Sequence, residues 1–85
     1  MKQQGHKELE ARIARLFTEK LQVELPSAEA DLFESGLLDS LRLVVLLSAL
    51  EEQFDVRVLM EELEFDDVRT LAQIASFVAA RAPGR

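Results

Sequence analysis

Apolar residues recur every three or four positions in the first and last parts of this 85-residue chain. In the first part they are Leu9, Ile13, Leu16, Phe17 and Leu21. In the last part they are Leu71, Ile74, Phe77 and Val78. This spacing places the apolar side chains on one face of a helix. We therefore predict a helix over residues 7–21 and another towards the C-terminus, capped by Asp66 or Asp67.

A third helix is predicted over residues 40–53, with Asp39 at or near the cap position and Ser40 at the start. This stretch is apolar nearly all round, so a single inward face cannot hide all of its side chains. The residues that we predict to face the core are Leu41, Val44, Leu47, Leu50 and Phe54. The remaining apolar residues of this helix, which must be covered by another segment or by a partner, are Leu43, Val45 and Leu46.

The connection between the first two helices is long. Residues 22–39 contain Pro26 and Gly36, which interrupt helices. A connection of this length in so small a chain is unusual unless it has a function. Its predicted apolar anchors are Leu32, Phe33, Leu37 and Leu38.

The stretch after the middle helix is too short and isolated to form a sheet. We predict a connector over residues 54–58, with Phe54 and Val58 pointing inward, and then a short helix over residues 60–64. The predicted fold class is all-α: a bundle of three main helices plus one short helix, with a long loop between the first two. We expect a single domain over residues 1–85, with its core at about 7–81, because a chain of this size supports one core.

The composition of the chain limits the kinds of chemical site that it can form. Cysteine is absent, so disulfides and thiolate metal sites are excluded, and any thiol that the protein uses must come from a cofactor. The one histidine, His6, has no second histidine or cysteine with which to bind a metal, so no metal is expected. The sequence shows no apolar signal segment and no run long enough to span a membrane, and we expect a cytoplasmic protein without membrane insertion.

The middle of the chain is strongly acidic. Residues 24–67 contain 13 acidic and two basic side chains, within a total net charge of −6. Such a surface repels phosphate backbones, so nucleic acid is not an expected partner. It steers encounters towards basic protein surfaces, although solubility alone also explains it.

One segment resembles a known family. The residues Asp-Leu-Phe-Glu-Ser-Gly-Leu-Leu-Asp-Ser-Leu at 31–41, followed by Glu-Glu-Gln-Phe-Asp at 51–55, resemble the phosphopantetheine-attachment region of acyl carrier proteins and of peptidyl or D-alanyl carrier proteins. The resemblance implies an acyl-carrier-protein-like bundle with 4′-phosphopantetheine attached covalently to Ser40. It also implies that Asp39 and Leu41 form the recognition motif for a phosphopantetheinyl transferase that uses coenzyme A as the donor.

The position of Ser40 agrees with this role. Unpaired N–H groups and the positive end of the helix dipole stabilise an anion at a helix N-terminus. Ser40 lacks a neighbouring base that would make it a catalytic nucleophile, so we expect no enzyme activity. The alternative is that Asp39 and Ser40 only cap the helix. The other serines do not compete: Ser27, Ser35, Ser48 and Ser76 lie in the loop or within predicted helices.

Three positions depart from the family pattern. Arg42 and Val45 stand where the family usually has acidic residues, and Leu59 stands where a proline is frequent. Because interface charges set encounter and selectivity, we predict a dedicated set of partners. The predicted partner-contacting residues are Leu38, Arg42, Val45, Glu51, Glu52 and Leu59. The alternative for Leu46 and Leu59 is burial.

Three functions remain open. The main hypothesis is an acyl carrier that holds acyl intermediates of lipid, polyketide or other secondary metabolism as thioesters and presents them to acyltransferases or synthases. The second is an aminoacyl, D-alanyl or peptidyl carrier loaded by an adenylating ligase, because the stretch over residues 34–40 is similar to that of D-alanyl carriers. The third is an unmodified acidic interaction domain. A monomer is expected in each case.

Overall fold

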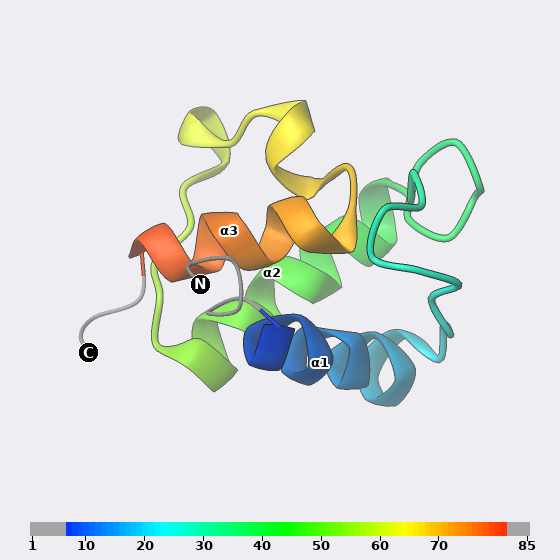
Figure 1. Cartoon of the computed structure of the whole chain (residues 1–85). Coiled ribbons are helices and arrows are strands. Elements are labelled where there is room, and N and C mark those ends of the chain that lie inside the picture. Colours follow the sequence, from blue (N-terminus) through cyan, green and yellow to red (C-terminus); the bar gives the residue numbers. More distant parts are fainter. Residues whose placement is uncertain (1–6, 82–85) are drawn as a thin grey trace.

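The computed structural model describes residues 7–81, apart from the side chain of Met60, so His6 lies outside the described residues. Three α-helices and three short helical segments follow one another along the chain (Figure 1). They are α1 (Lys7–Leu16), η2 (Phe17–Leu21), α2 (Ser40–Phe54), η3 (Met60–Glu62), η4 (Phe65–Val68) and α3 (Leu71–Arg81). No strand occurs between residues 7 and 81, and the predicted all-α class with three main helices is confirmed.

The predicted first helix is present as two continuous parts. α1 packs against α3, and the five-residue π-helical turn η2 packs against α2. Ile13 and Phe17 are fully buried on this face. The helix ends at Gln22, whose φ of +58° is left-handed, and the N–H of Val23 donates to the carbonyl of Phe17 at 3.0 Å. This hydrogen bond, which joins residues six positions apart, closes the last, π-helical turn.

The inward face of α2 is not the one that we predicted. Leu41 and Val44 were expected in the core, but they are 74% and 54% exposed. The helix instead buries Leu46, Leu47, Ala49 and Leu50. Leu43 and Phe54 are partly buried against this set. The core stripe is therefore centred on Leu46 and Leu50, one turn apart, and Leu41, Val44 and Val45 lie on the other side of the helix.

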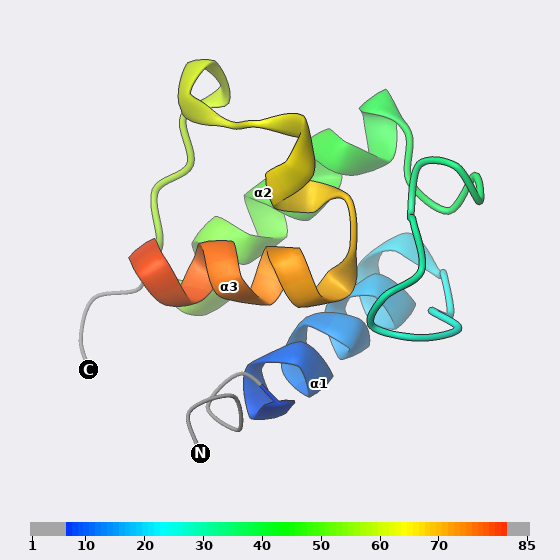
Figure 2. The same ribbon diagram turned by 45° about the horizontal axis from the view of Figure 1, so that its top comes forward.

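The long loop of residues 22–39 runs along one end of the bundle and leads into the start of α2 (Figure 2). Its predicted anchors are confirmed: Leu32 and Leu38 are buried, and Phe33 and Leu37 pack partly buried against the core. Two backbone hydrogen bonds also join it to the α3 region. The N–H of Leu32 donates to the carbonyl of Arg69 at 2.8 Å, and the N–H of Ala72 donates to the carbonyl of Ala28 at 3.0 Å.

The segment between α2 and α3 differs in detail from the prediction. Val56 is the buried residue of the connector, whereas Phe54 and Val58 are only partly buried. Two 3-10 turns, η3 and η4, replace the single short helix that we expected over residues 60–64. A 3-10 turn forms here because neither stretch is long enough to repay the cost of starting an α-helix.

The cap of α3 is also different. Thr70 Oγ1 accepts a hydrogen bond from the N–H of Gln73 at 3.1 Å, so Thr70 takes the place predicted for Asp66 or Asp67. Asp67 instead accepts from the N–H of Glu64 at 3.0 Å within η4. Asp66 pairs with Arg69 at 3.4 Å. The extra turn η4 separates both aspartates from the helix start.

Candidate functional site

The start of α2 is built around Asp39. Asp39 has the extended backbone of an N-cap residue, and its Oδ1 accepts a hydrogen bond from the N–H of Arg42 at 2.9 Å. Its carbonyl accepts from the N–H of Leu43 at 2.8 Å, which opens the ladder of the helix. The predicted cap is therefore confirmed. Because Asp39 performs the capping, the hydroxyl of Ser40 is not needed for it.

Ser40 is the first residue of α2, and it is exposed. Within the described part of the chain, no hydrogen bond is formed by its hydroxyl or by the N–H groups of Ser40 and Leu41. Free N–H groups at the N-terminus of a 15-residue helix carry a partial positive charge, and they favour a nearby anion by about 0.3–1 kcal/mol. The site thus presents a reachable hydroxyl next to a favourable place for negative charge.

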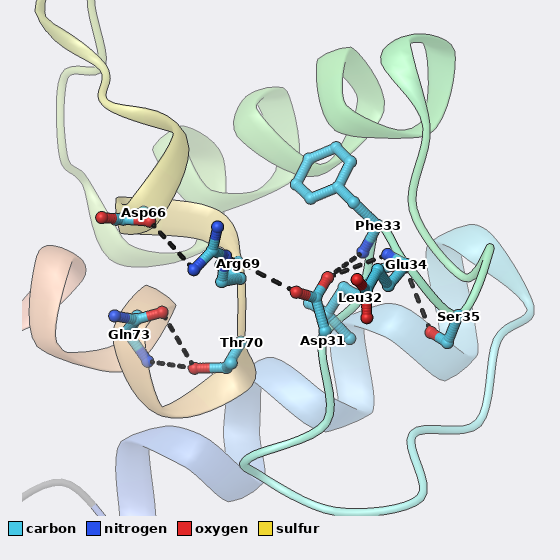
Figure 3. Close-up of polar contacts among 9 residues, drawn as sticks. All are labelled: Asp31, Leu32, Phe33, Glu34, Ser35, Asp66, Arg69, Thr70 and Gln73. Atoms are coloured by element: carbon cyan, nitrogen blue, oxygen red, sulfur yellow. Dashed lines mark hydrogen bonds and ion pairs between the residues drawn. The ribbon is translucent and has the colours of Figure 1, made fainter.

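The turn before Ser40 is held by its own polar groups. Asp31 Oδ1 accepts hydrogen bonds from the N–H groups of Phe33 at 3.0 Å and Glu34 at 2.8 Å (Figure 3). The N–H of Leu38 donates to the carbonyl of Leu32 at 2.9 Å. These bonds, with the burial of Leu38, fix the backbone that enters α2.

The other described serines lie in different surroundings. Ser35 donates from its hydroxyl to the carbonyl of Leu32 at 3.4 Å inside the turn. Ser48 and Ser76 lie in the middle of α2 and α3, where the backbone N–H groups are bonded within the helix. Ser27 lies in the long loop. Among residues 7–81, Ser40 is the serine at the N-terminus of a long helix.

A family model described as "Phosphopantetheine attachment site" matches residues 11–78, which is most of the chain and extends from within α1 to within α3. The chain belongs to this family of phosphopantetheine-binding carrier proteins. The resemblance stated from the sequence is confirmed. It follows that the protein is a carrier with a covalently attached 4′-phosphopantetheine as its cofactor.

Curated relatives give a more detailed comparison. The chain is 40% identical over 50 residues to the D-alanyl carrier protein of Lactococcus lactis subsp. cremoris (strain MG1363). It is 42% identical over 50 residues to the D-alanyl carrier proteins of Streptococcus sanguinis (strain SK36) and Streptococcus thermophilus (strain LMD-9). Each match covers 59% of this chain and 63% of the relative, so it spans less than two thirds of the length of these carriers.

The surface of the carrier beside Ser40 is apolar. Leu41, Val44 and Val45 are exposed along one side of α2, and Leu59 is 44% exposed beyond its far end. The alternative hypothesis for Leu46 and Leu59 was that both are buried. It is confirmed for Leu46 and is wrong for Leu59. The sequence did not indicate that Leu41 and Val44 would be exposed, because every side of this helix carries aliphatic residues.

The predicted partner-contacting residues of the carrier lie in different environments. Leu38 is only 2% exposed and belongs to the core, so its predicted contact with partners is corrected: a side chain buried this deeply is not accessible to a partner. Arg42 pairs with Asp39 at 3.6 Å. Glu51 Oε2 accepts from the N–H of Val58 at 2.8 Å and so fastens the connector after α2. Glu52 and Val45 are exposed.

Two further observations complete the description of the carrier. Within residues 7–81, no three acidic or histidine side chains lie close enough together to hold a metal ion. None of the described helices is both long and apolar enough to cross a membrane.

Proposed function

We propose that Ser40 carries the phosphopantetheine and that the protein is an aminoacyl carrier of the D-alanyl type, formed by a single domain whose core spans about residues 7–81. The observation that supports the attachment point best is the exposed Ser40 hydroxyl at the first residue of α2, next to a cap that is already complete. The free N–H groups of Ser40 and Leu41 favour the negative charge of a phosphodiester there.

The composition of the chain fits this cofactor. The bound group supplies a terminal thiol on a flexible arm, on which cargo is held as a thioester. The chain has no cysteine of its own, so this thiol is not duplicated. The role of the protein is to hold the arm at a defined point and to present it to partner enzymes, where the tether raises the local concentration of the cargo.

Ser40 needs help to become modified. No basic side chain is hydrogen-bonded to its hydroxyl among residues 7–81, so nothing in the described structure removes the proton. A phosphopantetheinyl transferase must supply the base, with coenzyme A as the donor. Asp39 and Leu41 flank the serine and are exposed, and both are therefore available to this enzyme. The carrier itself performs no catalysis in this proposal.

The comparisons favour an aminoacyl cargo over the acyl cargo of our main sequence hypothesis. The curated relatives are D-alanyl carrier proteins, and the match to them extends over 50 residues. The half-buried Arg42 and the exposed Val45 are consistent with partners other than those of fatty-acid carriers. We therefore propose loading by an adenylating ligase. Family membership leaves the unmodified interaction domain without support.

The attachment point is tested by intact-protein mass spectrometry. The protein is incubated with coenzyme A, magnesium and a broad-specificity phosphopantetheinyl transferase, and the product is mapped by peptide digestion. We expect one phosphopantetheine on the wild type, none on Ser40→Ala, and one on the controls Ser35→Ala and Ser48→Ala. Ser40→Ala remains folded because Asp39 still caps the helix. Modification of Ser40→Ala would refute the assignment.

The cargo is tested on the modified protein. It is offered D-alanine with ATP and a D-alanine-activating ligase, and in a parallel reaction it is offered octanoate with ATP and an acyl-carrier-protein synthetase. We expect a hydroxylamine-sensitive mass increase with D-alanine and a much slower one with octanoate. Loading with octanoate alone would support the acyl carrier instead.

A further inference from the structure

Arg69 lies between η4 and α3, and it contacts the segment that leads to Ser40. Its Nε is 3.5 Å from Asp31 Oδ2, and its Nη1 is 3.4 Å from Asp66 Oδ1 (Figure 3). The guanidinium carbon also lies 5.0 Å from the centre of the Phe65 ring. One side chain thus joins η4 to Asp31 in the long loop.

Asp31 uses its two carboxylate oxygens for different purposes. Oδ1 accepts from the N–H groups of Phe33 and Glu34 and so forms the turn. Oδ2 is the oxygen that faces Arg69. The pair with Arg69 therefore orients the carboxylate that holds the turn.

Backbone and aromatic contacts reinforce this connection. The N–H of Leu32 donates to the carbonyl of Arg69 at 2.8 Å, and the carbonyl of Leu32 accepts from the N–H of Leu38 at 2.9 Å. The rings of Phe33 and Phe65 lie 4.8 Å apart between centroids. Leu38 directly precedes Asp39 and Ser40, so a continuous set of contacts runs from Arg69 to the start of α2.

We propose that Arg69 is a positioning residue for the modification of Ser40. Through Asp31 it keeps the loop of residues 31–38 in the shape that the transferase binds. This inference rests on the proposed attachment at Ser40. The Arg69–Asp66 pair is exposed and the Arg69–Asp31 pair is partly exposed, and such surface pairs contribute little to global stability. They matter here because the apparent affinity of an enzyme that binds one loop shape falls in proportion to the population of that shape.

Arg81 provides a matched control. It stacks on Phe77 at 4.1 Å and pairs with Glu62 at 3.9 Å, so it makes the same two kinds of contact as Arg69. It lies at the last residue of α3, whereas Arg69 precedes the first. Comparing Arg69→Gln with Arg81→Gln therefore separates an effect on the loop from the general loss of an arginine.

The first experiment measures amide hydrogen exchange in the unmodified protein, and it does not depend on the cofactor. Arg69→Gln should raise the exchange rates of the amides of Phe33, Glu34 and Leu38 by about threefold, whereas Arg81→Gln should leave them unchanged. Equal rates in the two variants would overturn the proposal.

The second experiment measures the steady-state kinetics of phosphopantetheine transfer. Arg69→Gln should raise the KM of the transferase for the carrier about three- to fivefold with kcat unchanged, because only the population of the competent loop shape falls. Arg81→Gln should match the wild type. A fall in kcat without a rise in KM would contradict a positioning role.

A double-variant comparison distinguishes positioning from direct contact with the transferase. Asp31→Asn keeps an oxygen for the turn but removes the charge that faces Arg69. It should reproduce the rise in KM, and combining it with Arg69→Gln should add little further. Additive effects would mean that Arg69 contacts the enzyme directly, which would overturn the proposal. A wild type that is not modified at Ser40 would instead refute the proposed function, and this inference with it.

Discussion

At the scale of single residues, Asp39 and Ser40 have different surroundings although they are adjacent. The Asp39 carboxylate is engaged by the N–H of Arg42, and the Ser40 hydroxyl is exposed. Had Ser40 been the cap, its oxygen would be bonded to the backbone, and modification would cost the helix its first hydrogen bond. With the cap one residue earlier, the hydroxyl is available without loss of helix stability.

Replacement of Asp39 tests this arrangement. Asp39→Ala should lower the free energy of unfolding by about 1 kcal/mol, because the N–H of Arg42 loses its acceptor. The melting temperature should fall by about 4–8 °C for a domain of this size. Asp39→Asn keeps an acceptor oxygen and loses only an exposed ion pair, so it should remain close to the wild type.

Thermal unfolding followed by circular dichroism at 222 nm measures both variants under the same conditions. If Asp39→Asn were as destabilising as Asp39→Ala, the charge rather than the hydrogen bond would stabilise the helix start. That outcome would contradict the capping role.

At the scale of elements, α2 serves two purposes on its two sides. One side contributes Leu46, Leu47 and Leu50 to the core, and the other exposes Leu41 and Val44 beside Ser40. An exposed aliphatic stripe next to the proposed attachment point is available to partner enzymes. The helix that supports the core therefore also forms the surface around the proposed attachment point.

Truncations on the two sides of α2 should have very different costs. Leu50→Ala should destabilise the protein by about 2–5 kcal/mol, because Leu50 is fully buried and a cavity remains. Leu41→Ala should change stability by less than about 0.5 kcal/mol, because the side chain is 74% exposed. Urea denaturation of both variants checks this difference. Similar costs would mean that the orientation of α2 is wrong.

At the scale of the whole molecule, charge is concentrated in the middle of the chain. Residues 24–67 supply 13 of the 16 acidic side chains, yet the first two turns of α2 contain Arg42 and no acidic residue. The surface nearest to Ser40 thus combines exposed aliphatic residues with the paired Asp39 and Arg42 within an acidic protein. Such a surface is suited to partners that differ from the basic enzymes attracted by fatty-acid carriers.

Restoring acidic residues tests this selectivity. The double variant Arg42→Asp with Val45→Glu should be modified or acylated faster by enzymes that serve general fatty-acid carriers. The gain should be clear at low ionic strength and should shrink at 1 M salt, where the Debye length is about 3 Å. Steady-state rates at the two salt concentrations measure it.

The control changes the net charge equally at another place. Arg15→Asp with Gln22→Glu also lowers the net charge by three units, and both residues are exposed near α1 and η2. If this control gained as much rate as the α2 variant, the total charge and not the surface beside Ser40 would select the partner.

Local sequence patterns were sufficient to predict part of the structure. The helix of residues 7–21, the start of α2 at Ser40 and the Asp39 cap depend on nearby residues only, and the apolar character of Leu32 and Leu38 was enough to predict them as loop anchors. Helical periodicity and capping act over about one turn, so they can be read directly from the chain. The phosphopantetheine family was likewise indicated by one contiguous motif and is confirmed.

Other features were decided by tertiary packing. The sequence of α2 is aliphatic on every side, so no polar residues mark which side faces the core. Contact with the rest of the bundle decides this, and it buries Leu46 while Leu41 stays exposed. Thr70 caps α3 because Asp66 and Asp67 belong to η4, which ends before the helix begins. Asp31 and Arg69 are 38 positions apart, and the chain contains 16 acidic residues that could pair with an arginine. Only the fold brings Asp31 to Arg69. The sequence thus determined the helices and the candidate attachment point, whereas the tertiary structure determined the faces of α2 and the contacts that hold the loop before Ser40.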